Sequence, residues 1–469
     1  MSSEWYALND DSQGVIITES KQVMKPVVAI VGRANVGKSA LFNRLTGESA
    51  AIVEDLPGTT RDRAFADASW QGQEVILIDT GGLEPNPNSP LGQKVKGQVE
   101  AAIAEADVII FVVDIRDGAI ATDWEIADQL HSCDKPIVLV ANKADNARLE
   151  SQVVDFYQLG IGTPLVISAH HGRGISKLLD VVLPLLPQSS PSFVDSGRPK
   201  LAIVGRPNVG KSMLLNAITG QERTIVDHVP GTTRDAVDTA YHYNGQEILL
   251  IDTAGIKRRG RVGVGVDYYS FIRTLRAINR CDVALLVTDA TEFITAQDVH
   301  IAGYIKQSCK GMLLVVNKWD LVSEQPKAEY THHVEQRLRF MAHTPVLYAS
   351  AKFGQGIDKI IPDALAIWQE RQKQLPNSTV DKLIKEAVMA HAPPRRGSKR
   401  LRVVHAYQTG INPPSFSFLV NDPTLVHFSY QRYLENKLRQ TFGFHGTSLR
   451  FLFKKAPSRR FGRTGGNKA

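Results

Sequence analysis

Short runs of apolar and β-branched residues alternate along the chain with longer segments that have helical periodicity. In the first part of the chain these runs are Val27 to Val31, Val75 to Ile78, Val108 to Val113, Ile137 to Val140 and Leu165 to Ile167. Strands buried on both faces of a parallel sheet consist of apolar runs of this length, and the helical segments between them supply the crossovers. The pattern predicts an α/β fold in which helices wrap a mostly parallel sheet.

This pattern is present twice, because several segments recur in the same order. Residues 28–39, 57–62 and 77–82 recur 173 positions later, at residues 201–212, 230–235 and 250–255. Residues 142–145 recur at 317–320 and residues 168–169 at 350–351, so the offset grows to 175 and then to 182. Insertions accumulate in loops, and a slowly growing offset is therefore typical of a duplicated domain. We interpret the chain as a tandem duplication followed by an unrelated third segment.

The repeat divides the chain into six parts. They are a flexible arm (1–25), a first copy (26–187), a linker (188–198), a second copy (199–375), a small α/β segment (376–456) and a basic tail (457–469). We expect the second copy to end in a helix near Ile367 to Gln374. In the third segment we expect strands near Leu401 to Ala406 and Ser415 to Val420, followed by a helix near Tyr430 to Thr441.

Each copy carries a GxxxxGKS loop between an apolar strand and a helical segment. This is the context of a P-loop, whose backbone N–H groups surround phosphate oxygens at a helix N-terminus. Lys38 and Lys211 are expected to reach the β- and γ-phosphates and to act in catalysis. The predicted phosphate-binding residues are Gly32, Arg33, Ala34, Asn35, Val36, Gly37, Lys38, Ser39, Gly205, Arg206, Pro207, Asn208, Val209, Gly210, Lys211 and Ser212.

A DxxG motif follows a later strand in each copy. Its aspartate can hold a magnesium-bound water, and its glycine can offer an N–H to the γ-phosphate. The motif residues predicted to bind nucleotide are Asp79, Thr80, Gly81, Gly82, Leu83, Asp252, Thr253, Ala254, Gly255 and Ile256.

The repeated Pro-Gly-Thr-Thr-Arg-Asp segment is expected to supply a second hydroxyl for Mg²⁺, in a loop that switches with the nucleotide. We favour Thr60 and Thr233 for this role, which also places them in catalysis, and the spacing leaves Thr59 and Thr232 as alternatives. The predicted metal ligands are Ser39, Thr60, Asp79, Ser212, Thr233 and Asp252.

The motif NKxD indicates which base is bound. The carboxylates of Asp145 and Asp320 can accept hydrogen bonds from the N1–H and the 2-amino group of guanine, neither of which adenine offers. Asn142 and Asn317 are expected to tie this loop to the P-loop. The full set is Asn142, Lys143, Ala144, Asp145, Ser168, Ala169, Asn317, Lys318, Trp319, Asp320, Ser350 and Ala351. The motifs together predict two sites for GTP or GDP with Mg²⁺.

The side chain that follows DxxG is aliphatic in both copies, Leu83 in the first and Ile256 in the second. Ras-like enzymes carry a glutamine there, which orients the attacking water. An aliphatic side chain cannot do so, and slow intrinsic hydrolysis or another electrostatic device is therefore implied.

Composition excludes several other classes of protein. A chain of 469 residues with 43% hydrophobic and 22% charged residues is typical of about three globular domains. The cysteines Cys133, Cys281 and Cys309 are too far apart for a disulfide framework or a zinc site. The apolar runs are too short to span a bilayer, and no secretory signal pattern is present, so we expect a cytoplasmic protein.

The net charge of +7 is unevenly distributed. The chain from Asn377 onward has 17 basic and 4 acidic residues, a net charge of +13, whereas the preceding residues carry a net charge of −6. Such a basic segment with interleaved aromatic residues favours contacts with RNA phosphates, although a solvated tail is the simpler interpretation of the last dozen residues. Gly443 to Gly446 has the letters GxxG of a KH loop, but it falls between a helix and a strand.

These motifs resemble the Der (EngA) family, bacterial-type GTPases with two tandem G domains and a KH-like C-terminal domain. The resemblance runs from about Pro26 to about Lys455. It rests on the doubled Gly-Arg-x-Asn-Val-Gly-Lys-Ser and Pro-Gly-Thr-Thr-Arg-Asp, on Asn-Lys-Trp-Asp at 317–320 and on residues 430–439. The chain departs from the family in having Ala34 where proline is usual, and in its longer N-terminal arm.

The resemblance implies that GTP hydrolysis serves maturation of the large ribosomal subunit. It implies rRNA as a partner, no membrane and no DNA, and a monomer that associates with ribosomes in the cytoplasm. It also implies that Asn35 and Asn208 help to hold K⁺ against the phosphates in catalysis, which would compensate for the missing glutamine. The alternatives are a tRNA-modification or membrane-associated regulatory GTPase, and an RNA-binding scaffold in which one G domain only senses nucleotide.

Overall fold

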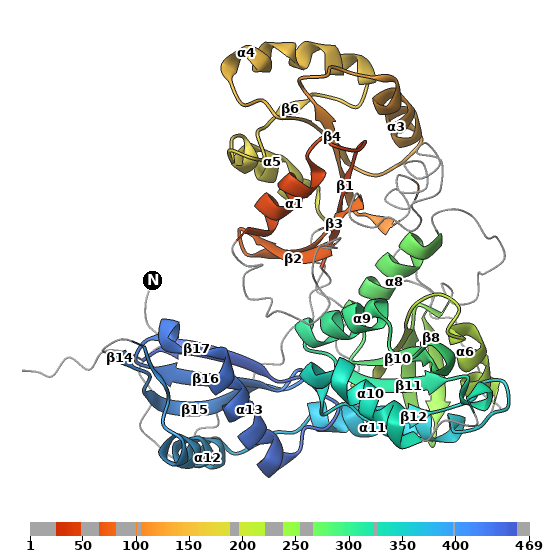
Figure 1. Ribbon diagram of the computed structural model, residues 1–469, viewed down its shortest axis with the longest axis vertical. Helices are drawn as coiled ribbons and strands as arrows, with labels where there is room; N and C mark the ends of the chain where they lie inside the picture. The colour runs from red at the N-terminus through yellow and green to blue at the C-terminus, as the bar shows by residue number, and fades with distance from the viewer. Residues whose placement is uncertain are drawn as a thin grey trace, which may run out of the picture.

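The computed structural model describes residues 25–47, 65–80, 100, 105–187, 197–220, 238–253, 266–322, 327–396 and 399–456. The predicted arm (except Lys25), residues 188–196 of the predicted linker and the whole basic tail lie outside these ranges. The described residues form two six-stranded sheets, one three-stranded sheet and a two-stranded ribbon (Figure 1). No helix in these ranges is long and apolar enough to cross a membrane.

The first sheet has the strand order β2-β3-β1-β4-β5-β6. Only β2 runs antiparallel to its neighbour, β3, and the other pairs are parallel. Four of the five predicted apolar runs lie within its strands, and the fifth, Leu165 to Ile167, extends one residue beyond β6. The elements are β1 (Val27–Val31), α1 (Lys38–Thr46), β2 (Phe65–Trp70), β3 (Gln73–Asp79), β4 (Val108–Asp114), α3 (Ala121–His131), β5 (Ile137–Asn142), α4 (Ala147–Glu150), η3 (Ser151–Leu159), β6 (Leu165–Val166), α5 (Ile175–Val182) and η4 (Leu183–Leu185).

The core of this domain follows from the period of two along its strands. In β1, Val27 and Ala29 belong to one apolar cluster, and Val28 and Ile30 belong to another on the opposite face of the sheet. Both faces are therefore covered, as parallel sheets require. The loops at the carboxyl ends of the strands remain available for a ligand.

The second sheet has the order β8-β9-β7-β10-β11-β12, which matches the first sheet strand for strand. This identity of topology confirms the predicted duplication. The elements are β7 (Lys200–Val204), α6 (Lys211–Gly220), β8 (Thr239–Tyr243), β9 (Gln246–Ile251), α8 (Val266–Arg280), β10 (Val283–Asp289), η5 (Ala290–Glu292), α9 (Ala296–Gln307), β11 (Gly311–Asn317), η6 (Trp319–Leu321), α10 (Lys327–Arg337), η7 (Arg339–Met341), β12 (Val346–Tyr348), η8 (Ile357–Lys359) and α11 (Ile360–Arg371).

The last helix of this domain begins earlier than we predicted. The helix expected near Ile367 to Gln374 is α11, which runs from Ile360 to Arg371. Pro362 lies in its first turn, where a proline is tolerated because no N–H partner is lost. The predicted bounds were wrong because this proline separates the buried Ile360 and Ile361 from the rest of the helical pattern.

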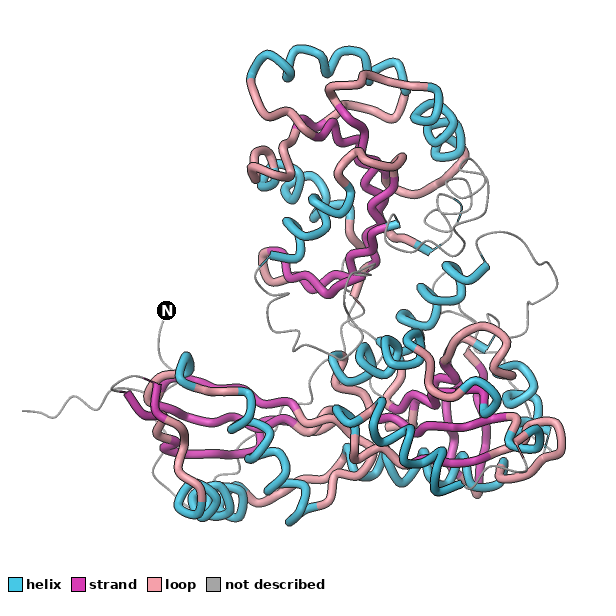
Figure 2. Tube along the Cα trace, in the orientation of Figure 1, coloured by secondary structure: helices cyan, strands magenta, loops and turns pink. Residues whose placement is uncertain are grey.

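The third domain packs α12 and α13 against one face of the sheet β15-β16-β17, which lies beside the second domain (Figure 2). Strands β15 and β16 are antiparallel, and β16 and β17 are parallel. The strand expected at Leu401 to Ala406 begins at Val403 and continues to Gly410. The elements are α12 (Asn377–Ala390), β13 (Arg395–Arg396), β14 (Lys399–Arg400), β15 (Val403–Gly410), β16 (Ser415–Val420), η9 (Pro423–Leu425), α13 (Phe428–Phe442) and β17 (Arg450–Lys455).

A buried arginine joins the second and third domains. Arg371 is 1% exposed, and its guanidinium donates to Oδ1 of Asn412 at 2.8 Å and to Oγ1 of Thr447 at 3.0 Å. Two backbone bonds extend the contact, from Met312 to Gly446 at 2.7 Å and from Gly446 to His343 at 2.8 Å. The third domain is therefore hydrogen-bonded directly to the edge of the second.

Ion pairs connect the first two domains. Arg273 and Arg276 in α8 face Glu105 and Asp107, which lie just before β4. Arg273 donates to Glu105 at 2.6 Å, and Arg276 donates to Asp107 at 3.1 Å. The helix α8 of the second domain therefore contacts the first domain at the amino end of its central strand.

Candidate nucleotide-binding sites

Both P-loops connect a central strand to the helix that follows it. β1 leads through residues 32–37 into α1, and β7 leads through residues 205–210 into α6. Gly37 and Gly210 have φ angles of 93° and 95°, in the left-handed region that favours glycine. A Cβ atom at Gly37 would lie 2.4 Å from Nδ2 of Asn142, and one at Gly210 would lie 2.3 Å from Nδ2 of Asn317. A side chain at either position would therefore push the NKxD loop away from the P-loop.

The P-loop lysines are held inside their loops. Nζ of Lys38 donates to the carbonyls of Gly32 and Arg33 at 2.8 and 2.7 Å. Lys211 donates to the equivalent carbonyls of its own loop, each at 2.6 Å. Both lysines are 7% exposed, and burial lowers the pKa of Lys38. Phosphate oxygens in the loop would lie within reach of these cations.

The arginines of the two loops make a different contact. Arg33 pairs with Asp117 at 2.6 Å, and Arg206 pairs with Glu292 at 2.7 Å. Their side chains are engaged by carboxylates, which leaves their backbone N–H groups as the part that could contact a phosphate.

Two predicted metal ligands of the first domain are in contact. Oγ of Ser39 donates to Oδ2 of Asp79 at 2.6 Å, and Asp79 is 1% exposed. Mg²⁺ prefers hydroxyl and carboxylate oxygens, so this pair fits the ion at the start of α1. Ser212 in α6 and Asp252 after β9 hold the equivalent positions of the second domain.

The asparagine of NKxD joins three loops in each domain. Nδ2 of Asn142 donates to the carbonyl of Val36 at 2.9 Å, and its Oδ1 accepts from the N–H of Ala169 at 3.0 Å. Asn317 makes the same two bonds, to Val209 at 2.9 Å and from Ala351 at 3.0 Å. The predicted tie between the base loop and the P-loop is confirmed in both domains.

The lysines of NKxD are anchored by acids that the sequence analysis missed. Nζ of Lys143 lies 2.6 Å from Oδ2 of Asp114, and Nζ of Lys318 lies 2.5 Å from Oδ2 of Asp289. Both lysines have positive φ angles, 69° and 62°. The signal was present in the sequence, because each acid ends a buried apolar strand at equivalent places in the two copies. The anchor fixes the lysine stem beside the expected position of the base.

The base-motif carboxylate of the first domain has two side-chain donors. Oγ of Ser168 donates to Oδ1 of Asp145 at 2.6 Å, and Nη2 of Arg116 donates to Oδ2. The bond from Ser168, together with that from Arg116, holds the pKa of Asp145 below its ordinary value. Asp145 is therefore ionised at neutral pH, as recognition of two guanine N–H groups requires. Arg116 was not among the predicted site residues.

Several other predicted residues have structural contacts. Oγ1 of Thr80 donates to the carbonyl of Ile30 at 2.8 Å, and Thr253 shares a 2.7 Å hydrogen bond with Thr239. The ring of Trp319 packs on that of Tyr348, with centroids 4.4 Å apart.

Eight predicted residues lie outside the part of the chain that the structure describes. They are Thr60, Gly81, Gly82, Leu83, Thr233, Ala254, Gly255 and Ile256, and the alternatives Thr59 and Thr232 lie outside it as well.

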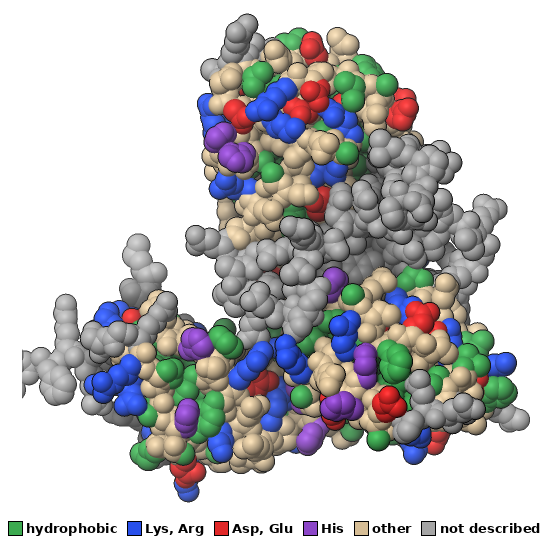
Figure 3. Space-filling model, viewed as in Figure 1, with side chains coloured by type: hydrophobic (Ala, Val, Ile, Leu, Met, Phe, Trp, Pro, Cys, Tyr) green, Lys and Arg blue, Asp and Glu red, His purple; other side chains and the backbone are tan. Residues whose placement is uncertain are grey.

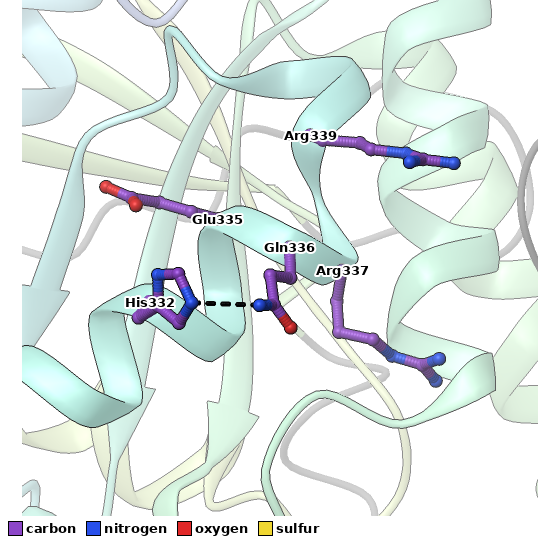
Figure 4. Close-up of a pocket in the computed structure, with 5 residues that line it drawn as sticks. All are labelled: His332, Glu335, Gln336, Arg337 and Arg339. Atoms are coloured by element: carbon purple, nitrogen blue, oxygen red, sulfur yellow. Dashed lines mark hydrogen bonds between the residues drawn. The ribbon is translucent and has the colours of Figure 1, made fainter.

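A surface hollow of about 570 Å³ lies on the second domain and is lined by His332, Glu335, Gln336, Arg337 and Arg339 (Figure 4). All five come from α10 and η7, and His332 and Gln336 are joined by a 2.8 Å hydrogen bond. The chain passes from here to the amino end of β12, whereas the nucleotide motifs lie at the carboxyl ends of the strands. The hollow is therefore separate from the nucleotide site.

Basic side chains gather at the outer end of the third domain (Figure 3). β14 and the end of β17 both lie beside the end of β16, because the side-chain amide of Asn421 donates to the carbonyl of Arg400 at 3.0 Å and Val420 pairs with Lys455. Hydrogen bonds from Thr424 and the charges of Lys399 and Lys455 lower the pKa of the Asp422 carboxyl group. The exposed basic residues of this region, here called the basic end, are Arg395, Lys399, Arg400, Arg402, Lys454 and Lys455.

Comparison with known families gives matches to all three domains. The family described as "50S ribosome-binding GTPase" matches residues 27–143 and again residues 200–318. The family described as "KH-domain-like of EngA bacterial GTPase enzymes, C-terminal" matches residues 374–454.

Curated relatives match nearly the whole chain. GTPase Der of Moorella thermoacetica is 48% identical over 93% of this chain and 100% of the relative. GTPase Der of Thermomicrobium roseum is 47% identical over 92% and 96%, and that of Desulforamulus reducens is 46% identical over 92% and 98%. With two nucleotide-binding loops of the same geometry on one scaffold, the chain is a GTP-hydrolysing enzyme that belongs to the GTPase Der family.

Proposed function

We propose that both G domains bind and hydrolyse GTP with Mg²⁺, and that the cycle serves assembly of the large ribosomal subunit. In each domain the P-loop lysine acts on the β- and γ-phosphates, the serine and the DxxG aspartate hold Mg²⁺, and the NKxD aspartate selects guanine. The proposed switch threonines are Thr60 and Thr233. The equal hydrogen bonds of Asn142 and Asn317 support this assignment in both domains.

Potassium is proposed to replace the missing glutamine. Asn35 and Asn208 occupy the same place in their loops, with φ angles of 66° and 65°. A cation held by their side chains against the phosphates would stabilise the charge that develops in the transition state. Hydrolysis is then faster in K⁺ than in Na⁺, and Asn35→Ala with Asn208→Ala removes the difference.

The observation that carries the ribosomal part of the proposal is the basic end on a domain hydrogen-bonded to a G domain. Lys399 and Lys455 are exposed at this end, and Arg371 joins that domain to the second G domain. The description of the matching family as ribosome-binding supports rRNA as the partner. Lysines and arginines that neutralise phosphates supply binding that weakens with salt.

The remaining parts of the proposal follow from this role. The arm, the two G domains, the linker, the KH-like domain and the tail have the bounds given by the sequence analysis. The protein acts as a monomer in the cytoplasm, in association with ribosomes.

The test is co-sedimentation with purified large ribosomal subunits in GTP and in GDP. We expect binding to depend on the nucleotide, and to be lost on charge reversal at the basic end (Lys399→Glu with Lys455→Glu). The control is Lys177→Glu, an exposed lysine in α5 of the first G domain. Binding that is equal in both nucleotides and insensitive to the charge reversal would contradict the proposal.

A further inference from the structure

In the first G domain, the carboxylate assigned to guanine has an arginine partner. Nη2 of Arg116 donates to Oδ2 of Asp145, and Ser168 donates to Oδ1 at 2.6 Å. The side chain of Arg116 is 52% exposed and that of Asp145 26%. Guanine would approach the same carboxylate with its N1–H and 2-amino group.

The second G domain provides an internal comparison, because its backbone has the same geometry. The N–H of Arg116 donates to Oδ1 of Asp114 at 3.1 Å, and the N–H of Thr291 donates to Oδ1 of Asp289 at 3.0 Å. These two acids pair in their sheets with the asparagine of the NKxD motif. Thr291 is therefore the structural equivalent of Arg116.

The two residues direct their side chains to different acceptors. The hydroxyl of Thr291 donates to Asp289 at 2.8 Å, on its own turn. Among the described residues of the second domain, none makes an ion pair with Asp320, the counterpart of Asp145.

Other residues around Asp145 also differ in charge from their counterparts around Asp320. Nε2 of His171 lies 3.8 Å from Oδ1 of Asp145, and Nη1 of Arg173 donates to the backbone carbonyl of Asp145 at 3.2 Å. The same β-bridge closes this loop in both domains, and it places Phe353 and Gln355 at the equivalent positions. At these three positions the first base site therefore carries the basic residues Arg116, His171 and Arg173, and the second carries the uncharged Thr291, Phe353 and Gln355.

We propose that Arg116 competes with the guanine base for Asp145, so that the first G domain binds guanine nucleotides more weakly and releases them faster than a threonine at this position would allow. The difference between Arg116 and Thr291 then contributes to unequal nucleotide affinities in the two domains. This inference rests on the proposed assignment of Asp145 to guanine. Exposed ion pairs of this kind shift an equilibrium by about two- to fivefold.

The first experiment measures the affinity of the full-length chain for a fluorescent GDP. Asp320→Asn removes guanine binding from the second site, so the signal reports the first. We expect Arg116→Thr to tighten GDP binding about two- to fivefold and to slow release, with a smaller effect at high salt. Lys177→Thr, which also removes an exposed cation from the first G domain, is the matched control and leaves the affinity unchanged.

The second experiment is a double-mutant cycle with xanthosine diphosphate. Asp145→Asn is expected to exchange guanine for xanthine recognition, and the neutral amide no longer attracts Arg116. Adding Arg116→Thr to this variant therefore leaves the xanthosine diphosphate affinity unchanged. GDP binding unaltered by Arg116→Thr, or an equal effect in both backgrounds, overturns the inference. Asp145→Asn that still prefers guanine contradicts the guanine site itself, and the inference with it.

Discussion

The side-chain amide of Asn142 donates a 2.9 Å hydrogen bond to the backbone carbonyl of Val36 and so joins the base loop to the P-loop. Asn317 and Val209 form the same bond at the same distance in the second G domain. These loops are expected to hold opposite ends of one nucleotide, so the bond sets the distance between the base site and the phosphate site.

Asn142→Ala is predicted to lower both the stability of the first G domain and its affinity for nucleotide. The side chain is 2% exposed, and its loss leaves the carbonyl of Val36 and the N–H of Ala169 without this partner. Each unpaired buried group costs about 1–3 kcal/mol. Urea unfolding is expected to show a loss of about 2–4 kcal/mol, and GDP titration an affinity at least about tenfold lower.

The matched control for this change is Asn146→Ala. Asn146 is exposed and accepts from the N–H of Leu149 at 3.1 Å. Its loss should change the unfolding free energy by less than about 1 kcal/mol. Equal stability of the two variants would show that the Asn142 bond does not hold the loops together.

Arg371→Met is predicted to uncouple the KH-like domain from the second G domain. The buried guanidinium bonds Asn412 and Thr447, and their polar groups lose this donor in the variant. Each buried polar group left unpaired costs about 1–3 kcal/mol, so a loss of about 2–4 kcal/mol in the free energy of unfolding is expected. Calorimetry should resolve a separate transition for the KH-like domain. Lys385→Ala, which breaks the surface pair with Asp381, should leave the profile unchanged, and a wild-type profile for Arg371→Met would refute the coupling.

His343 is predicted to make stability depend on pH. Burial, with the nearby cation of Arg439, lowers the pKa of His343 to about 3. The unfolded chain binds this proton near pH 6.5 and the folded chain does not. The contribution of neutral His343 to the free energy of unfolding is therefore complete above about pH 6.5. It is lost as the pH falls toward 3, by about 1.4 kcal/mol per pH unit.

The measurement is urea unfolding at pH 6.5 and pH 5. His343→Gln should show a decrease in unfolding free energy about 2 kcal/mol smaller than that of the unmodified chain. His332→Gln changes an exposed histidine of the same domain and should keep the original decrease. The same decrease in all three proteins would rule out His343 as its source.

The contact between the two G domains is predicted to depend on its ion pairs. Glu105 is 5% exposed and faces Arg273, and Asp107 faces Arg276. Glu105→Gln with Asp107→Asn removes both negative charges while keeping the side-chain shapes. At low salt, energy transfer between dyes on the two domains should be lower in this double variant than in the unmodified chain. In the unmodified chain, the transfer should fall as the salt concentration rises. Unchanged transfer would mean that apolar packing alone sets the contact.

Most of the fold could be predicted from local pattern, and the exceptions have physical causes. The run at Val27 to Val31 coincides with β1, because a strand buried on both faces needs a continuous apolar run. The start of α11 could not be found in this way, since Pro362 is compatible with a first turn but is typical of a boundary. The bonds of Arg371 join residues far apart in the sequence, and no local pattern encodes them.

In the candidate site, too, a contact that a motif specifies could be predicted, and the other contacts were missed. The tie from Asn142 to the P-loop could be predicted, because the motif fixes the place of this residue, whereas the bonds of Lys38 to the carbonyls of Gly32 and Arg33 were not predicted. Asp114 could have been found as the acid that ends a buried strand in each copy. Arg116 could not, because its contact with Asp145 depends on two loops meeting in space and the second copy has Thr291 instead.

The most direct test of the central claim, that both G domains are working enzymes, is steady-state GTP turnover by the full-length chain with Lys38→Ala or Lys211→Ala. Each change removes the P-loop cation that is proposed to act on the phosphates of one site. We predict that each single variant releases phosphate more slowly than the unmodified chain, and that the double variant falls to background. Turnover equal to that of the unmodified chain in either single variant would contradict the claim.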